Sequence, residues 1–488
     1  MRKKAVGSLI QKAENTNGRQ TKTIMTIAIV LLLILGFGLV STGHYNPIIN
    51  KGAVAIFVGV LAWILYILNG TYYVSTEHAG DLINIHQNGM KDLLSIRSYI
   101  AKDVFSQYIF DACQIVFYLL ATIGIVEVLN TNGCFDFISN WLRTPKARYL
   151  LWSLSFFAYF LSANLDNFTT VMILLTVMHA IVKEKKLRIL YGAAILIATN
   201  CGGALTVIGN ISSLTLWVKG SVTPTWYSAV LFLPTLIAFI IPVALIGCKL
   251  PLRIDVGKYG SFYEGNDSAL ESWQKASMLI VGIGGLWFIP TFHRLTMMPP
   301  FLGAFCVLSL LWVINELYNK TLFKSDRMVS VKYPITMLHS NVQIILFYIG
   351  FVLLCGAVKE TGLFHTITNW CTNNQLNIYG ISAFIALLSG LIDDTVITLA
   401  NVSIFEVAPA TAVGYMDMFR ENGSHWFLSS LCTTLGGTCL LMGSWAGFAY
   451  MMIEDVSISW YVRHITGKML LGSMISIFIY SIIDFCFL

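Results

Sequence analysis

Three carboxylates lie inside stretches of this chain that are otherwise apolar: Asp166, which is followed by Asn167, and the adjacent pair Asp393 and Asp394. A carboxylate in apolar surroundings is costly unless a counter-charge or hydrogen bonds compensate it. Carboxylate oxygens combined with neutral amide and hydroxyl oxygens suit a hard cation such as Na⁺. We therefore predict a cation site, with Na⁺ at Asp166 and Asp393. The other predicted ligands share polar oxygens near these acids and are Asn167, Thr169, Thr170, Asp394, Asn210 and Ser444.

The adjacent pair Asp393 and Asp394 adds a second kind of chemistry. Two neighbouring carboxylates cannot both ionise cheaply in an apolar setting unless a cation is present. Such a pair carries a proton or a metal ion in turn, and this alternation is the chemical basis of proton-coupled exchange. Two plainer explanations stay open. Asp394 would point into a water-filled vestibule without a specific role, or segment 161–170 would be a polar surface loop with Asp166 solvated.

Glycines recur with the same spacing in segments 199–213 and 433–444, where a Gly-Gly pair is followed six residues later by another glycine. Glycine lets a backbone unwind and lets another backbone approach closely. Half-helices that meet at such a break would point their dipole ends and free carbonyl groups at a bound ion. The alternative is a packing seam between helices, which also favours glycine. The predicted helix-break glycines are Gly202, Gly203, Gly209, Gly436, Gly437 and Gly443.

The elements that position these residues must be membrane helices. Of the 488 residues, 56% are hydrophobic and only 11% are charged, and the mean hydropathy is +0.71, whereas a soluble domain averages about 25% charged residues. Apolar runs of about 20 residues, the length needed to cross a bilayer, recur along the chain. The first run, 24–40, is too long for a cleavable signal and lacks a small-residue cleavage site. We therefore predict an all-α polytopic membrane protein.

The net charge of +6 comes largely from basic residues in short connections, above all the N-terminus and segment 183–188. This distribution follows the positive-inside rule, which places both segments in the cytoplasm. The charge is therefore no sign of nucleic-acid binding. The ten cysteines lie apart without a CxxC pair, which is typical of small core residues and not of a disulfide or zinc framework.

An internal repeat organises the chain. Segment 115–118 aligns with 345–348 at an offset of 230 residues (345 minus 115), and the offset stays near this value along the repeat. A repeat whose hydrophobic segments are interrupted at corresponding positions is typical of secondary transporters built from two inverted repeats. Broken helices survive at membrane depth only where protein, water or an ion satisfies the free backbone groups. The other aligned segments are 132–135 with 361–364, 166–167 with 393–394, 202–203 with 436–437, and 208–210 with 442–444.

We predict four regions: N-terminal transmembrane helices with a polar loop at 1–103, a first transport repeat at 104–248, a connecting loop and linking helices at 249–334, and a second transport repeat at 335–488. Each repeat should contain a re-entrant hairpin and a broken transmembrane helix. Glu127 and Glu360 lie near matching ends of equivalent spans. They are candidates for a proton relay, although glutamates at a membrane interface are also common.

These motifs resemble the NhaD-type sodium/proton antiporters of the ion transporter superfamily, over residues 104–220 and 335–487. The resemblance implies an antiporter of the bacterial cytoplasmic (inner) membrane with two inverted repeats, which imports protons and exports Na⁺ or Li⁺. Its motifs are Phe-Leu-Ser-Ala-x-Leu-Asp-Asn-x-Thr-Thr at 160–170, Asn-x-Gly-Gly-Ala at 200–204, Leu-Ser-x-x-x-Asp at 388–393, and Gly-Gly-x-x-Leu-x-x-Gly-Ser-x-Ala-Gly at 436–447.

The chain departs from this family at two positions. Where relatives usually carry Pro-Ile-Gly-Asp, this chain has Val207-Ile208-Gly209-Asn210, and where they usually carry Asp-Asn it has Asp393-Asp394. One carboxylate is lost and another gained, so three core acids remain. The resemblance therefore implies roles for Asp166, Asn167 and Asp393 but not for Asn210, and we expect the second acidic pair to compensate for Asn210.

Other functions fit the sequence less well. A superfamily relative that carries an anion, such as a dicarboxylate or arsenite, would favour Asn and Thr at the hairpin tips, because carboxylates repel its substrate. An enzyme would need a nucleophile with a base or a metal cluster, and the sequence offers neither pattern. A channel fits less well, because the repeated broken helices match alternating access better. The expected partners are the lipid bilayer, Na⁺ or Li⁺, and protons, without a cofactor or nucleic acid, and a homodimer is one candidate assembly.

Overall fold

The computed structural model describes residues 16–42, 50–68, 73–74, 78, 93–135, 142–255, 270–319 and 335–487. The basic N-terminal segment 1–15, most of the polar loop 70–92 and the connecting segment 256–269 lie outside the described residues. In the described part, helices are the regular structure, and β-pairing is limited to two isolated bridges, Lys146 with Arg253 and Ala408 with Arg420. The predicted all-α class is confirmed.

The chain is a multi-pass membrane protein. In the described residues, seven helices are long and apolar enough to cross a bilayer. An eighth span forms if Ser272–Gly284 and Phe288–Thr296, which meet at a bend of 44°, count as one broken helix. The seven spans are Thr23–Ser41, Lys51–Leu68, Ile96–Thr131, Pro224–Gly247, Pro300–Asn319, Val342–Glu360 and Ile458–Cys486.

Three further apolar helices are too short to cross. They are α10 (Asn167–Ile181), α19 (Ile378–Leu391) and α20 (Asp394–Ile404). At about 1.5 Å per residue even α10, with 15 residues, extends about 22 Å, whereas a bilayer core is about 30 Å thick. These are the arms expected of re-entrant hairpins.

The chain divides into two compact units. The smaller contains residues 1–113, 342–376 and 399–406, and the larger contains 114–341, 377–398 and 407–488. In the smaller unit, α3 (Lys51–Leu68) packs closely on the Val342–Glu360 part of α17 (Ile335–Glu360), because a methyl group on Gly350 would lie only 2.3 Å from the carbonyl carbon of Ala55. The boundaries of the two units follow the packing of the helices and differ from those of the four predicted regions. The four regions therefore stay a prediction.

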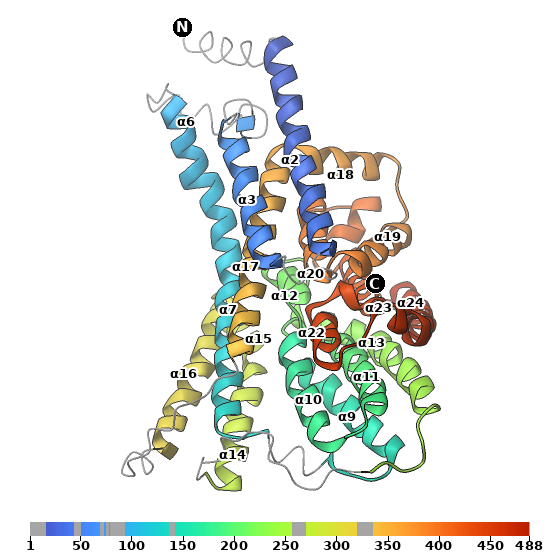
Figure 1. Cartoon of the computed structure of the whole chain (residues 1–488). Coiled ribbons are helices and arrows are strands. Elements are labelled where there is room, and N and C mark those ends of the chain that lie inside the picture. Colours follow the sequence, from blue (N-terminus) through green and yellow to red (C-terminus); the bar gives the residue numbers. More distant parts are fainter. Residues whose placement is uncertain are drawn as a thin grey trace. The chain divides into compact units, whose positions relative to one another are not determined.

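The larger unit contains both repeats of hairpin and broken helix. The first consists of α9 (Ala147–Ser162) with α10, followed by α11 (Lys185–Gly203) and α12 (Ile211–Val218). The second consists of α19 with the start of α20, followed by α21 (Ser424–Cys439) and α22 (Trp445–Glu454). In Figure 1, α9 and α10 lie at the lower end of this unit and α19 at its upper end, in keeping with two inverted-topology repeats.

The glycines allow each broken helix to cross its hairpin with the two backbones in contact. A methyl group on Gly202 would lie 2.1 Å from the Tyr159 carbonyl oxygen, and one on Gly436 would lie 2.0 Å from that of Ala386. Real side chains cannot approach so closely, so only glycine fits. Gly202, Gly203, Gly436 and Gly437 lie in the last turns of α11 and α21, and the helices break just after them, at 204–210 and 440–444.

Gly209 and Gly443 lie within the breaks themselves. A methyl group on either would lie 2.6 Å from a hairpin carbonyl oxygen, that of Ser162 for Gly209 and that of Ser389 for Gly443. The repeat that aligns these glycines in the sequence therefore aligns their contacts in space.

Candidate functional site

Asp166 ends the first hairpin turn and caps α10. Its Oδ2 accepts a hydrogen bond of 3.0 Å from the backbone N–H of Phe168, and the side chain is half-buried. A carboxylate at this position satisfies an otherwise unpaired amide and is stabilised by the positive end of the helix dipole. The sequence folds this way because an acidic residue is among the preferred N-caps.

Asp393 occupies the equivalent position in the second hairpin. Its Oδ1 accepts hydrogen bonds from the backbone N–H groups of Thr395 at 2.9 Å and Val396 at 3.4 Å, and the residue is only 4% exposed. The predicted Na⁺ positions, Asp166 and Asp393, are therefore carboxylates at the N-terminal ends of two short helices. Each carboxylate caps the helix that follows it in its own repeat.

A chain of neutral hydrogen bonds links the first hairpin to both broken helices. The hydroxyl of Ser162 donates to Asn167 Oδ1 at 2.9 Å, and Asn167 Nδ2 donates to Asn200 Oδ1 at 3.2 Å. Asn200 Nδ2 then donates to Thr438 Oγ1 at 3.1 Å and to Ser444 Oγ at 3.3 Å. All five residues are buried, so the polar path runs through the interior of the larger unit.

The two positions that depart from the family pattern contact each other. Asn210 Nδ2 donates to Asp394 Oδ2 at 3.3 Å, and the Thr395 hydroxyl donates to Asp394 Oδ1 at 3.2 Å. Asp394 also lies within electrostatic range of Asp166. The contact gives a physical basis for the hypothesis that Asp394 compensates for Asn210, because the carboxylate lies beside the amide that replaces the usual acid.

The second half-helices begin in the same way in both repeats. Asn210 caps α12 by accepting from the Ser212 N–H at 3.4 Å, and Ser444 caps α22 by accepting from the Gly447 N–H at 3.1 Å. Their backbone angles nearly coincide, with φ −148° and ψ 150° for Asn210 and φ −151° and ψ 150° for Ser444. Asn210 and Ser444 are thus equivalent in structure as well as in sequence.

The remaining predicted ligands differ in what they can offer a cation. Thr169 is half-buried, whereas the hydroxyl of Thr170 is buried without a hydrogen-bond partner in the described structure, as is that of Ser212. Among the described residues, no three His, Cys, Asp or Glu side chains gather to hold a metal ion. A cation near Asp166 and Asp394 would therefore depend on neutral ligands such as the hydroxyl oxygens of Thr170 and Ser212.

The two predicted relay residues do not share an environment. Glu127 lies in α7 (Phe105–Thr131), in the part that belongs to the larger unit, and is half-exposed. Glu360 belongs to the smaller unit, is 8% exposed, and lies 2.7 Å from His78 Nε2. It also accepts hydrogen bonds from the hydroxyls of Tyr108 at 2.7 Å and Tyr66 at 3.4 Å. The relay stays a prediction for both residues.

Four residues at the candidate site, three in the hydrogen-bonded path and one with a buried hydroxyl that has no partner among the described residues, were not predicted from the sequence. They are Ser162, Asn200, Ser212 and Thr438. Three of them lie within motifs or aligned segments of the repeat, and that position was the available signal. Asn200 meets Thr438 238 residues later and Ser444 244 residues later in the sequence, so spacing alone could not identify this contact.

Comparison with known proteins agrees with this architecture. The profile of the family CitMHS, described as citrate transporter, matches residues 21–427. Sodium/proton antiporter 1 of Arabidopsis thaliana is 29% identical over 360 residues, which cover 73% of this chain and 59% of that protein. Sodium/proton antiporter 2 of the same plant is 28% identical over 375 residues, covering 76% and 85% of the two chains.

Bacterial relatives and one solved structure extend the match. The Na⁺/H⁺ antiporter NhaD of Vibrio cholerae is 23% identical over 416 residues, covering 79% of this chain and 81% of that one. The resemblance to NhaD-type antiporters is confirmed. The crystal structure of the Alcanivorax borkumensis YdaH transporter, which has an unusual topology, superposes with a TM-score of 0.53 at 14% identity over 81% of this chain and 90% of that chain, so the two share a fold.

Proposed function

Since the chain belongs to the CitMHS family, we propose that this secondary transporter exchanges Na⁺ or Li⁺ for H⁺ by alternating access. Membership makes it a transporter of the ion transporter superfamily and not an enzyme. The relatives named above as sodium/proton antiporters support the choice of ions. The observation that carries the proposal is the pair formed by Asp394 and Asn210, a buried carboxylate beside an amide, within electrostatic range of Asp166.

The chemistry follows from these groups. A carboxylate in the interior gains from a bound proton or from a bound cation, and it cannot hold both on the same oxygen. Asp166 and Asp394 would therefore release a proton when Na⁺ or Li⁺ enters and regain it when the ion leaves. The buried hydroxyls of Thr170 and Ser212, which have no partner among the residues that the structure describes, would complete the shell of the ion.

An anion, such as the citrate of the family description, is the second candidate substrate. The observation that favours it is the set of short helices that begin at Asp166, Asp393, Asn210 and Ser444, because helix N-termini attract anions. Three carboxylates at or beside these ends oppose it. They occupy the positive ends themselves and would repel a dicarboxylate or citrate.

We place the transporter in the cytoplasmic membrane of a bacterium, with segment 183–188 on the cytoplasmic side. The basic residues of that segment support this orientation. The NhaD relatives are bacterial, although the two plant antiporters match with higher identity.

Exchange in everted membrane vesicles tests the proposal. A pH-sensitive dye should report proton movement when Na⁺ or Li⁺ is added to the parent protein, and Asp166→Asn and Asp394→Asn should each abolish it. Asp455→Asn is a matched control, since the Asp455 side chain is 90% exposed. If no cation moves protons and labelled citrate is taken up instead, the antiporter proposal is wrong. Full exchange in Asp166→Asn would reject the site while leaving the function.

A further inference from the structure

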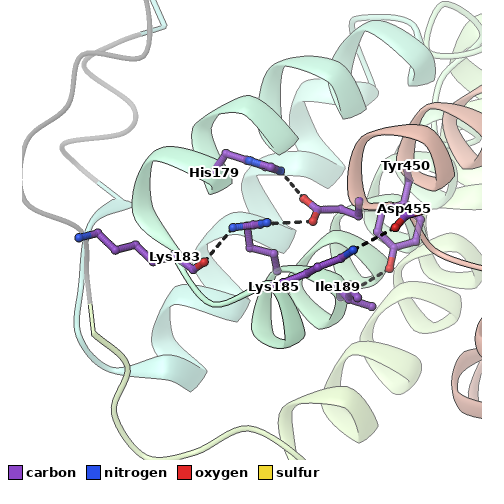
Figure 2. Close-up of polar contacts among 8 residues, drawn as sticks. His179, Lys183, Lys185, Ile189, Tyr450 and Asp455 are labelled. Atoms are coloured by element: carbon purple, nitrogen blue, oxygen red, sulfur yellow. Dashed lines mark hydrogen bonds and ion pairs between the residues drawn. The ribbon is translucent and has the colours of Figure 1, made fainter.

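A second charged cluster lies in the larger unit, away from the candidate cation site. It centres on Glu454, the last residue of α22, whose side chain is completely enclosed. His179 Nε2, near the end of α10, lies 2.5 Å from one carboxylate oxygen, and Arg188 Nε, near the start of α11, donates to the other at 3.3 Å. Figure 2 shows these contacts converging from three helices.

Further contacts join the end of α10, the start of α11 and the end of α22. Arg188 Nη1 donates to the Lys183 carbonyl oxygen at 2.8 Å, and the Tyr450 hydroxyl of α22 donates to the Ile189 carbonyl oxygen at 2.6 Å (Figure 2). A methyl group on Gly192 would lie 2.5 Å from Tyr450 Cε2, so α11 and α22 meet without a gap. By contrast, Lys185 and Asp455 form a neighbouring ion pair that is largely exposed.

The opposite ends of these helices build the candidate cation site. Asp166 and Asn167 begin α10, Asn200 lies in the last turn of α11, and Ser444 caps α22. The two levels lie about 15–20 Å apart along the helices, taking about 1.5 Å per residue. Thus α10, α11 and α22 are bonded to one another twice, once through Asn167, Asn200 and Ser444 and once through His179, Arg188 and Glu454.

We propose that Glu454 is a positioning residue for the cation site. Its carboxylate fixes the ends of α10, α11 and α22 that lie away from the cation site, and the helices transmit this constraint to Asp166, Asn200 and Ser444. A buried carboxylate that loses a partner leaves an uncompensated charge, so the cluster is stable only when all three helices are in place. The role rests on the proposed function, because it concerns the affinity for the transported cation.

The test is the Na⁺ concentration dependence of exchange in everted vesicles. Glu454→Gln removes the charge but keeps the shape, and we expect it to raise the KM for Na⁺ about fivefold or more, the usual range for coupled sites, with the maximal rate little changed. His179→Gln should act in the same direction. Asp455→Asn, which changes the adjacent exposed residue, should leave the KM as in the parent.

The outcomes separate three cases. If Glu454→Gln accumulates poorly, the KM for Na⁺ of His179→Gln, measured on the protein that reaches the membrane, decides between the outcomes. An unchanged KM in both variants, with only the amount of protein reduced, means an ordinary structural anchor and overturns the positioning role. A parent protein that exchanges no cation overturns the proposed function and this role together, which the parent measurement alone reveals.

Discussion

Exchanging the side chains of Asn210 and Asp394 probes the contact on which the proposed function rests. In the parent, one amide and one carboxylate meet with Nδ2 and Oδ2 3.3 Å apart. Asn210→Asp alone places a second carboxylate at that distance. Two unit charges 3.3 Å apart repel by about 5 kcal/mol at an effective dielectric constant of about 20. We expect exchange to fall steeply in this variant, since the amide donor to Asp394 is lost as well.

The other single variant, Asp394→Asn, removes the carboxylate and should also lose exchange. The double variant restores one amide and one carboxylate at nearly the same place. Coupling between contacting residues is about 0.5–3 kcal/mol, so we expect the double variant to exchange at least about tenfold faster than either single variant, which corresponds to about 1.4 kcal/mol.

Initial rates of dye dequenching in everted vesicles, measured over a series of Na⁺ concentrations and normalised to the protein in the membrane, give these differences. Asp484→Asn is a matched control in the same unit, because it removes a carboxylate that accepts a hydrogen bond from Tyr379 at 2.9 Å and should keep exchange. A double variant as inactive as Asp394→Asn would rule out the proposed role of this contact, since the position of the carboxylate would then matter more than its presence.

Three other substitutions test separate parts of the structure. Gly203→Ala places a methyl group 1.9 Å from Asn167 Oδ1 and should cost about 1–3 kcal/mol of stability and most of the exchange. By contrast, Gly380→Ala, whose methyl group would meet no described atom within 4 Å, should lower neither the melting temperature nor the rate. Thr170→Val removes a buried hydroxyl that has no partner in the described part of the chain, so it should raise the KM for Na⁺ without lowering the melting temperature, and an unchanged KM would remove Thr170 from the site. Glu360→Gln removes a carboxylate 2.7 Å from His78 Nε2 and should lower stability by about 1–3 kcal/mol, while a pH profile of exchange identical to that of the parent would end its candidacy as a proton relay.

The sequence was sufficient to identify the acids at the hairpin tips as equivalent positions. Asp166 and Asp393 stand out because each is an acid in an apolar run and the repeat makes them equivalent, and the structure gives each the same capping role. The glycine spacing likewise predicted close backbone approach, since steric exclusion at Gly202 and Gly436 depends on residue type.

The same reasoning could not identify hydrogen-bond and ion-pair partners that lie far apart in the sequence. Nothing near Asn200 in the chain indicates that its amide meets Ser444, 244 residues later. Glu454 is more extreme, because an acid at the end of an apolar run is ordinarily an interfacial residue in contact with water. Its burial depends on His179 and Arg188, which lie 275 and 266 residues away, and only the packed helices bring these charges together.

The hairpin acids also make the ends of two helices sensitive to protonation. A carboxylate accepts hydrogen bonds from the Phe168 and Thr395 amides more strongly than a neutral acid does. Caps of this kind contribute about 0.5–2 kcal/mol to a helix. Protonation of Asp166 or Asp393 therefore loosens the first turn of α10 or α20, and deprotonation tightens it. Amide hydrogen exchange at Phe168 and Thr395 would accordingly report the protonation of Asp166 and Asp393, independently of any movement of ions across the membrane.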